Sequence, residues 1–402
     1  MAPTLDDDLV LRAMTPADVG QVAALLAARG EPADGVDLEL VAADPDAGPE
    51  AVGVVVDGDR VVSTVTLLDE TLVLDGVAVP AGQVELVATD PAYEGRGLVR
   101  ALMRWAHERS RRRGHLAQVM IGIPFFYRQF GYAYTVPMGH WRRLLATPDG
   151  PADVTVRPAT AADIPAMHAL QAAEQRPFRL SMPHSPPCWR WLVARDGTQQ
   201  WVAERDGAVV ATARTTPPAE GVVVGELAAS DPAAALALVG ACRRTTDADV
   251  HVQERPGTVG GDAVEPLLAP AAGRPEWYYA RVADLAALLA HLAPVLHARL
   301  AAAGLADRRH DVLLSTYRSH LRFVIGPDGV SEPVVGGPLQ APVAAGGSGV
   351  PPDAVAPLVL GPYGAAGLGE RLPDCNLGRQ RDLMAALFPP LTADLLTFYL
   401  PA

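Results

Sequence analysis

Cysteine is scarce in this sequence: the 402 residues contain three, Cys188, Cys242 and Cys375. Their number is odd and they lie far apart, which argues against the close spacing of a zinc site and the paired framework of a disulfide-rich fold. We therefore expect three buried or idle thiols and no structural metal.

Three further features are missing: a surplus of positive charge, a long apolar run and a basic N-terminus. The formal net charge is −13 and the pI is about 5.2. A nucleic-acid partner is not expected, because phosphate contacts need a basic surface, whereas an acidic surface attracts cationic small molecules. No run reaches the ~18 apolar residues of a membrane span, and the acidic stretch Met1–Asp8 lacks the pattern of a signal peptide. We expect a cytoplasmic protein with no membrane partner.

The chain is long enough for two or three domains, and 49% of its residues are hydrophobic, so each domain can have a core of its own. It is organised around residues 84–113. Val84–Thr89 is an apolar run with β-branched residues that predicts a strand, which Asp90-Pro91 ends. After a Gly95–Gly97 turn, apolar residues recur at helical spacing from Leu98, and arginines crowd the last turn of this predicted helix.

A strand, a glycine turn and a helix together predict an anion site. Free amides at the helix start, reinforced by the helix dipole, favour a phosphate, and glycine lets the backbone approach it closely. A dinucleotide-binding fold would need a third glycine where Arg100 stands, and the Gly-Lys-Ser/Thr of a P-loop is missing. A plain connection between strand and helix remains the simpler alternative.

Segments of the first half recur in the second half in the same order. The offsets are all about 145 residues, which predicts two copies of one αβ unit. The second copy continues as Ala233–Leu238 without a glycine turn, so we expect it to keep the architecture and to lack the anion site. The matched segments are 9–19 with 154–164, 55–62 with 203–210, and 85–91 with 226–232.

The rest of the chain differs in kind. An apolar tail such as its last eight residues is normally docked against the protein. The elements expected here are a strand at Trp277–Val282, one apolar helix at Leu285–Ala303, strands at His310–Tyr317 and Leu321–Ile325, and the tail Leu395–Ala402.

The glycine turn resembles motif A of the GNAT superfamily of N-acetyltransferases, Gln/Arg-x-x-Gly-x-Gly/Ala, with Glu94 first, Gly97 kept and Val99 last. The layout of the whole chain, together with the aromatic motif Phe126–Tyr132, is similar to the Eis-type (enhanced intracellular survival) N-acetyltransferases. The resemblance implies transfer of an acetyl group from acetyl-CoA to a primary amine of a cationic small molecule, aminoglycoside-like or a polyamine. It also implies direct attack in a ternary complex, no metal, and a homo-oligomer, in this family a hexamer.

The fold class expected from this resemblance is α/β (α+β). Residues 1–150 would be an active GNAT domain that carries the acetyl-CoA site. Residues 151–283 would be a degenerate second GNAT domain, and residues 284–402 an α+β domain similar to sterol carrier proteins, whose C-terminus reaches the active site.

The same resemblance assigns the cofactor site. Amides of the turn would hold the pyrophosphate, a strand backbone would hold the pantetheine, and residues around Gly122 would flank the thioester arm. The residues so assigned are Leu86, Val87, Ala88, Glu94, Gly95, Arg96, Gly97, Leu98, Val99 and Gly122.

Two catalytic roles are expected. Tyr127 would donate a proton to the departing thiolate, since a phenol stays protonated at neutral pH; without the resemblance it reads as a core aromatic. The C-terminal carboxylate of Ala402 would be the base. Glu85 is another carboxylate near the turn, but the second copy repeats it as Glu226, which favours a structural role.

Two alternatives stay open. Because Glu94 and Val99 depart from motif A, the chain could instead be a non-enzymatic binder of an apolar ligand through its C-terminal domain. The stretch His184–Trp191, which is rich in proline and tryptophan, could wall a substrate pocket or be ordinary packing.

Overall fold

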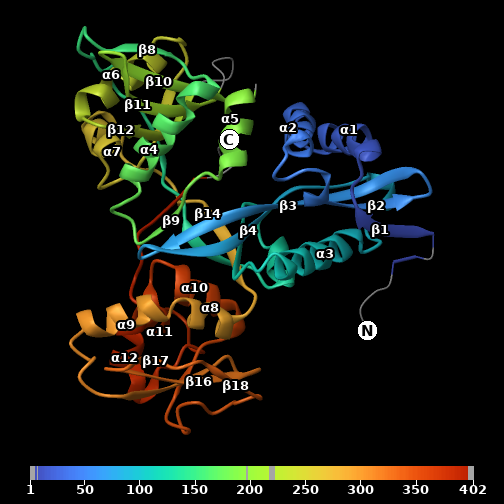
Figure 1. Ribbon diagram of the computed structural model, residues 1–402, viewed down its shortest axis with the longest axis vertical. Helices are drawn as coiled ribbons and strands as arrows, with labels where there is room; N and C mark the ends of the chain where they lie inside the picture. Colours follow the sequence, from blue (N-terminus) through green and yellow to red (C-terminus); the bar gives the residue numbers. More distant parts are fainter. Residues whose placement is uncertain (1–4, 7, 196–197, 217–221, 397–402) are drawn as a thin grey trace.

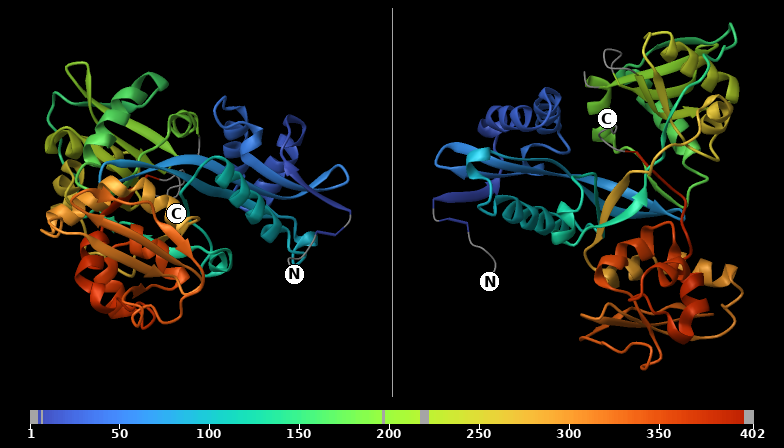
Figure 2. Two further views of the ribbon diagram at one scale, coloured as in Figure 1. Left: turned by 60° about the horizontal axis from the view of Figure 1, so that its bottom comes forward. Right: turned by 180° about the vertical axis from the view of Figure 1, so that it is seen from behind.

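The computed structural model describes residues 5–6, 8–195, 198–216 and 222–396. These residues form three sheets with helices around them (Figure 1). The long β3–β4 hairpin of the first sheet reaches between the other two parts, as both views of Figure 2 show.

The first sheet has nine strands, with the main order β1-β2-β3-β4-β5-β14-β6, and the pair β4 and β5 is parallel. Two short strands, β9 and β20, extend it beside the end of β3. Helices α1 and α2 cover one face and α3 the other (Figure 1). The strands are β1 (Leu9–Ala13), β2 (Val52–Asp57), β3 (Arg60–Leu74), β4 (Val77–Thr89), β5 (Ala117–Met120), β6 (Ala133–Pro137), β9 (Leu180–Met182), β14 (Trp277–Val282) and β20 (Ala393–Leu395). The helices are α1 (Val19–Arg29), α2 (Pro32–Ala43) and α3 (Leu98–Arg112).

Strands β4 and β5 separate part of the way along. They pair only where residues 81–83 meet residues 117–119. Further along β4, Leu86 has a positive φ of 50°, beside a register shift against β3. Such a bulge bends the strand and turns its edge away. Within the described residues, the remainder of β4 therefore has no strand partner on the β5 side.

The second sheet has six strands in the order β7-β13-β12-β11-β10-β8, and its parallel pair is β12 and β13. Reversed, this order matches that of the first sheet, with β7 in the place that β14 takes beside β5. The strands are β7 (Trp141–Arg143), β8 (Thr155–Pro158), β10 (Gln199–Arg205), β11 (Ala208–Thr215), β12 (Val222–Ala229) and β13 (Val250–Gln253). The helices are α4 (Ile164–Glu174), α5 (Pro186–Ala194), α6 (Pro232–Arg243) and α7 (Val259–Val264).

Details of the two copies also agree. Arg12 pairs with Asp18 at 2.6 Å in the first copy, and Arg157 pairs with Asp163 at 2.8 Å in the second. In both copies the aspartate also completes a capping box at the start of the first helix, which satisfies amides that the helix leaves open. The predicted duplication is therefore present in the backbone and in its capping contacts.

The third part has a five-stranded sheet, and its hydrophobic core is continuous with residues of the first sheet. Its elements are β15 (His310–Ser315), β16 (His320–Gly326), β17 (Gly329–Val330), β18 (Val334–Gly336), β19 (Ser348–Gly349), α8 (Leu285–His291), α9 (Ala293–Ala302), α10 (Val355–Leu360), α11 (Gly364–Arg371) and α12 (Arg381–Leu387).

One expected element is wrong: Leu285–Ala303 is not a single helix. It divides into α8 and α9, which are bent by 65°. Pro294, in the first turn of α9, has no amide to donate and would clash within a continuous helix. Of the helices in the described ranges, none is both long and apolar enough to cross a membrane by itself; only α8 and α9 taken together meet that length and composition.

The sheets do not follow the expected sequence boundaries at residues 150 and 283. Strand β14 lies in the first sheet, between β5 and β6, although its sequence follows the second copy. Strand β7 precedes residue 150 and lies in the second sheet. The two copies thus exchange strands, which joins them more closely than a linker would.

Candidate active site

The site begins where β4 ends. A 3-10 turn, η3 (Pro91–Tyr93), follows the strand and leads into the glycine turn. Gly95 and Gly97 have φ values of 76° and 81°, a conformation that glycine adopts without strain. Helix α3 begins at Leu98, as the sequence predicts, and its first amides have no partner inside the helix. This corner can therefore bind an anion.

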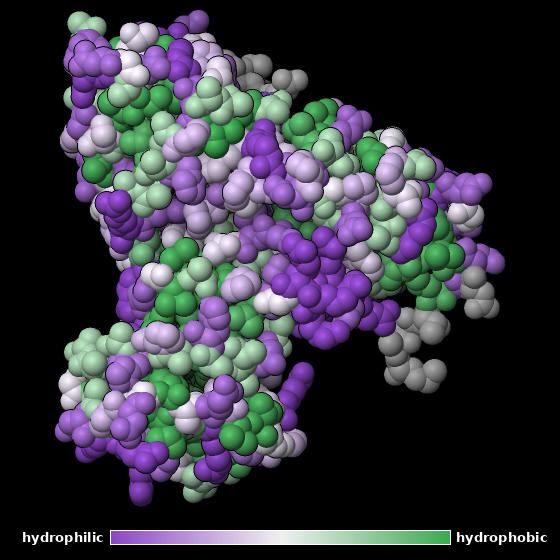
Figure 3. All heavy atoms as spheres, viewed as in Figure 1, coloured by the Kyte–Doolittle hydropathy of each residue, from purple (hydrophilic) through white to green (hydrophobic). Residues whose placement is uncertain are grey.

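The packing of α3 holds this corner in place. Leu98, Leu102, Met103 and Ala106 are buried against the first sheet, so the apolar spacing of the sequence is the face that docks. Arg111 and Arg112 of its last turn are exposed, and hydrophilic side chains gather over this helix in Figure 3. The helix start is thus fixed relative to β4.

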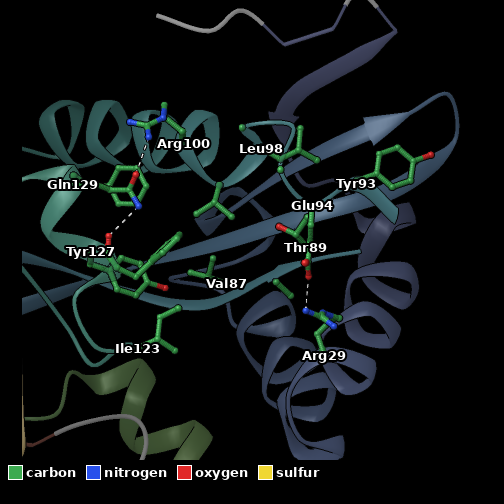
Figure 4. Close-up of a pocket in the computed structure, with 16 residues that line it drawn as sticks. Arg29, Val87, Thr89, Tyr93, Glu94, Leu98, Arg100, Ile123, Tyr127 and Gln129 are labelled. Atoms are coloured by element: carbon green, nitrogen blue, oxygen red, sulfur yellow. Dashed lines mark hydrogen bonds and ion pairs between the residues drawn. The ribbon is translucent and has the colours of Figure 1, made fainter. Parts of the chain in front are cut away.

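A cavity of about 540 Å³ runs from the glycine turn to the aromatic motif. Figure 4 shows Tyr93, Glu94, Leu98 and Arg29 at one end and Tyr127, Gln129 and Ile123 at the other. The residues that line it are Arg29, Val87, Ala88, Thr89, Tyr93, Glu94, Gly95, Gly97, Leu98, Val99, Arg100, Ile123, Phe126, Tyr127, Gln129 and Phe130.

Most of the residues assigned from the sequence meet at this cavity. Of the assigned set, Leu86, Arg96 and Gly122 are not part of its lining. Leu86 is buried and forms the bulge of β4. Arg96 turns away to Asp6, with 2.7 Å between Nη2 and Oδ2.

The unpaired edge of β4 reaches the cavity wall at Val87, next to Ala88, whose carbonyl accepts a hydrogen bond from the Ser63 hydroxyl of β3. Backbone amides and carbonyls on such an edge are free to bond an extended ligand, as an added strand would. This arrangement suits a long, narrow, amide-containing molecule whose anionic end reaches the glycine turn.

Tyr127 lies in the 3-10 turn η4 (Phe126–Phe130) at the other end of the cavity. Burial, followed by the nearby Glu85 carboxyl, raises the pKa of its phenol to about 12. Its ring packs against four other aromatic rings, those of Phe126, Phe130, Tyr132 and Tyr279. The residue is therefore both a core aromatic and part of the cavity wall.

Gly122 lies directly beneath the Tyr127 ring. A Cβ at this position would lie 2.3 Å from Cε2 of Tyr127, far inside van der Waals contact. Its role in the structure is to let the ring approach the backbone, and its neighbour Ile123 forms the cavity wall.

Glu85 is buried on the face covered by α2. Burial raises its pKa to about 8, although the amide of Gln83 donates to it at 2.5 Å. Asp34 and Asp37 raise this pKa further, whereas Arg195 lowers it. Its counterpart Glu226 differs: a buried carboxylate paired with Arg214 and His184, whose charges lower its pKa against the effect of burial.

Sequence reasoning missed Arg29, at the end of α1. Its Nη2 lies 2.6 Å from Oε1 of Glu94, and both residues line the cavity. They are separated by 65 positions, and no local pattern links them. Only the packing of α1 beside β4 brings this cation to the glycine turn.

The predicted base, the carboxylate of Ala402, lies outside the described residues. The chain leading to it enters the fold as β20, which pairs in parallel with β9. Arg255 and Asp394 hold this strand through a buried ion pair at 2.8 Å, and the Leu396 amide donates to the Met182 carbonyl at 2.9 Å.

The stretch His184–Trp191 is partly packing and partly cavity wall. Cys188 and Trp189 are buried, and burial raises the pKa of the Cys188 thiol well above its usual range. Trp191 is also buried, yet together with Ser185, Pro186 and Pro187 it lines a separate cavity of about 320 Å³ beside Asp69 and Arg109.

Comparisons with known proteins agree with this geometry. Residues 11–135 match the family model described as an acetyltransferase (GNAT) domain. A curated protein of Streptomyces avermitilis, named an uncharacterized N-acetyltransferase, is 33% identical over 206 residues. The match covers 45% of this chain and 50% of that protein, so it spans about half the length of the curated relative.

Solved structures are similar to almost the whole chain at low identity, which shows the fold alone. A GCN5-related N-acetyltransferase from Anabaena variabilis has a TM-score of 0.70 at 14% identity, over 96% of this chain and 99% of that one. A GCN5-related N-acetyltransferase from Kribbella flavida has a TM-score of 0.67 at 20% identity, over 98% of each chain. Eis1 from Mycobacterium abscessus has a TM-score of 0.60 at 18% identity, over 94% of this chain and 97% of that one. The comparisons therefore show a match to a GNAT acetyltransferase domain over residues 11–135 and, for the whole chain, a mixed α/β fold similar to that of these solved structures.

Proposed function

We propose that this chain is an acetyl-CoA-dependent N-acetyltransferase that acetylates a primary amine of a cationic small molecule, aminoglycoside-like or a polyamine. One observation carries the proposal: a single cavity joins the glycine turn at the start of α3, the unpaired edge of β4 and the Tyr127 side chain. These are an anion site, an extended backbone site and a proton donor, in the order that an acyl-CoA would need.

Residues present in the cavity fit this cofactor. Amides of the turn from Glu94 to Val99 would hold its diphosphate, and the edge of β4 at Val87 and Ala88 would bond its pantetheine amides. An amide of this strand would face the thioester oxygen, where negative charge develops during acyl transfer.

The proposed reaction is direct attack in a ternary complex. The amine nitrogen bonds to the thioester carbonyl carbon, the carbon–sulfur bond then breaks, and a proton leaves the nitrogen for a base. Tyr127 donates its phenolic proton to the departing thiolate, because a pKa of about 12 keeps this phenol protonated at neutral pH. The proposed base is the C-terminal carboxylate of Ala402, a role that the resemblance to the Eis-type enzymes supports.

The acceptor class rests on charge. The chain has a formal net charge of −13, which draws cations toward its surface. Resemblance to the Eis-type enzymes supports the same class, and it also supports a cytoplasmic homo-hexamer with a C-terminal domain similar to sterol carrier proteins. Light scattering of the purified chain tests the hexamer.

The alternative, a binder of an apolar ligand through the C-terminal domain, has less support. A cavity formed by residues of that domain alone measures about 160 Å³ and is lined by polar and small residues with two valines, below the ~300–1,000 Å³ of most small-molecule sites. The cavity of about 480 Å³ that residues 391–395 help to line is shared with residues of the other two parts. Moreover, Arg29 compensates the charge of Glu94 beside the glycine turn.

The test is to incubate the protein with acetyl-CoA and a panel of polyamines and aminoglycosides, and to follow the free thiol of CoA. We expect thiol release with at least one amine and binding of acetyl-CoA by calorimetry. Neither release nor binding would reject the proposal, and a lipid co-purifying with the C-terminal domain would then favour the alternative.

A further inference from the structure

We propose that Arg29 binds the diphosphate of the cofactor, and that Glu94 holds Arg29 beside the glycine turn until the diphosphate displaces it. This inference rests on the proposed function and adds a cofactor-binding residue to it. It starts from a conflict in the site: the glycine turn is built for an anion, yet its first side chain, Glu94, is itself an anion.

The structure resolves this conflict through α1. Arg29 is the last residue of that helix, and its guanidinium reaches the carboxylate of Glu94 at the end of the cavity formed by the glycine turn. Figure 4 shows the pair beside Thr89. Gly95 follows Glu94 directly, so a diphosphate on the turn amides would lie next to this guanidinium.

Other cations near the turn are committed elsewhere. The chain has no lysine, so a side chain that stays positively charged here must be an arginine. Among the described residues that line the cavity, the arginines are Arg29 and Arg100. Arg100 donates to Gln129 at 2.7 Å, toward the aromatic end, while Arg60 pairs with Asp90.

The Arg29–Glu94 pair is suited to exchange partners. The two side chains are 39% and 53% exposed, and ion pairs of that exposure contribute little to stability. A diphosphate offers more charge and the geometry that a guanidinium bonds in two places. Once Arg29 moves to the phosphate, Glu94 is free to turn toward solvent, away from a like charge.

The experiment compares two substitutions with opposite expected signs. Arg29→Gln removes the phosphate partner and should weaken CoA binding roughly tenfold, as expected for one charged hydrogen-bonding contact. Glu94→Gln removes the competing carboxylate and should strengthen binding, by roughly threefold or more. Arg60→Gln breaks a comparable ion pair that does not line the cavity, and it should leave CoA affinity unchanged.

Binding is measured by calorimetry with CoA and with dephospho-CoA, which keeps the diphosphate and lacks the 3′-phosphate. We expect Arg29→Gln to lower the binding affinity by the same factor for both ligands. A loss of affinity seen with CoA alone would place Arg29 on the 3′-phosphate and overturn the inference. An unchanged CoA affinity in Arg29→Gln, or a weaker CoA affinity in Glu94→Gln, would also overturn it. Failure of the unsubstituted protein to bind CoA would instead overturn the proposed function. Thermal unfolding confirms that each variant is folded.

Discussion

Replacing Gly122 with alanine tests whether the position of the Tyr127 ring controls the reaction. The added methyl carbon would lie 2.3 Å from Cε2 and 2.6 Å from Cδ2 of that ring. Carbon atoms in contact normally lie ~3.5–4.0 Å apart, so the ring or the segment under it must shift by about 1 Å.

Tyr127 cannot move away freely, since it is buried among aromatic rings on its other sides. Overpacking of this kind costs ~1–3 kcal/mol of stability. A displacement of ~1 Å at a reacting group can cost ~10²-fold in rate. We therefore expect Gly122→Ala to remain folded, to lose much of its turnover and to bind acetyl-CoA with little change.

The assay measures kcat and KM for acetyl-CoA by thiol release, together with the melting temperature. Gly20→Ala, on α1, is the matched control: a Cβ there meets nothing within 4 Å apart from its own stretch of helix backbone, and alanine favours a helix by ~0.5–1 kcal/mol. Gly20→Ala should keep full turnover. Normal turnover in Gly122→Ala would refute the argument that the ring must keep its place.

Three further outcomes are expected. Tyr127→Phe should lower kcat by roughly 10²-fold or more without weakening acetyl-CoA binding, because it removes only the proton that the thiolate needs. Burial raises the pKa of Glu70 from 4.5 to about 8, so the folded chain keeps a proton that the unfolded chain releases, and stability falls as pH rises between these values. Glu70→Gln should reduce that fall. The melting temperature of the variant minus that of the parent should therefore be larger at pH 9 than at pH 6. Arg255→Met should lower the free energy of unfolding in urea by ~3–5 kcal/mol, because it leaves Asp394 partly buried without its partner, whereas Arg381→Met, from an exposed pair, should cost ~0–1 kcal/mol.

Each of these can fail. An unchanged kcat in Tyr127→Phe removes that phenol from the mechanism. A parallel pH dependence in Glu70→Gln and the parent would mean that the Glu70 carboxyl is not kept protonated by burial. Equal losses for Arg255→Met and Arg381→Met would show that the ion pair at β20 contributes no more than a surface pair.

Local features of the structure could be predicted from the sequence. Helix α3 begins at Leu98 because glycines end the extended chain there and apolar residues then recur at helical spacing. The β2–β3 hairpin and the capping boxes of the two copies depend on residues a few positions apart. The division of Leu285–Ala303 was available in the same way, since Pro294 marks it.

Some contacts were decided by the tertiary structure alone. Strand β14 fits between β5 and β6 although more than 130 residues separate it from either, and β7 crosses into the second sheet. A strand sequence specifies a pleated, half-buried surface and leaves the choice of neighbour to packing. Arg29 reaches Glu94 for a similar reason: α1 must bury its apolar face on the sheet, and its last residue then lies over the glycine turn. The sequence by itself determined where an anion could bind, and the tertiary structure decided which cation stands beside it.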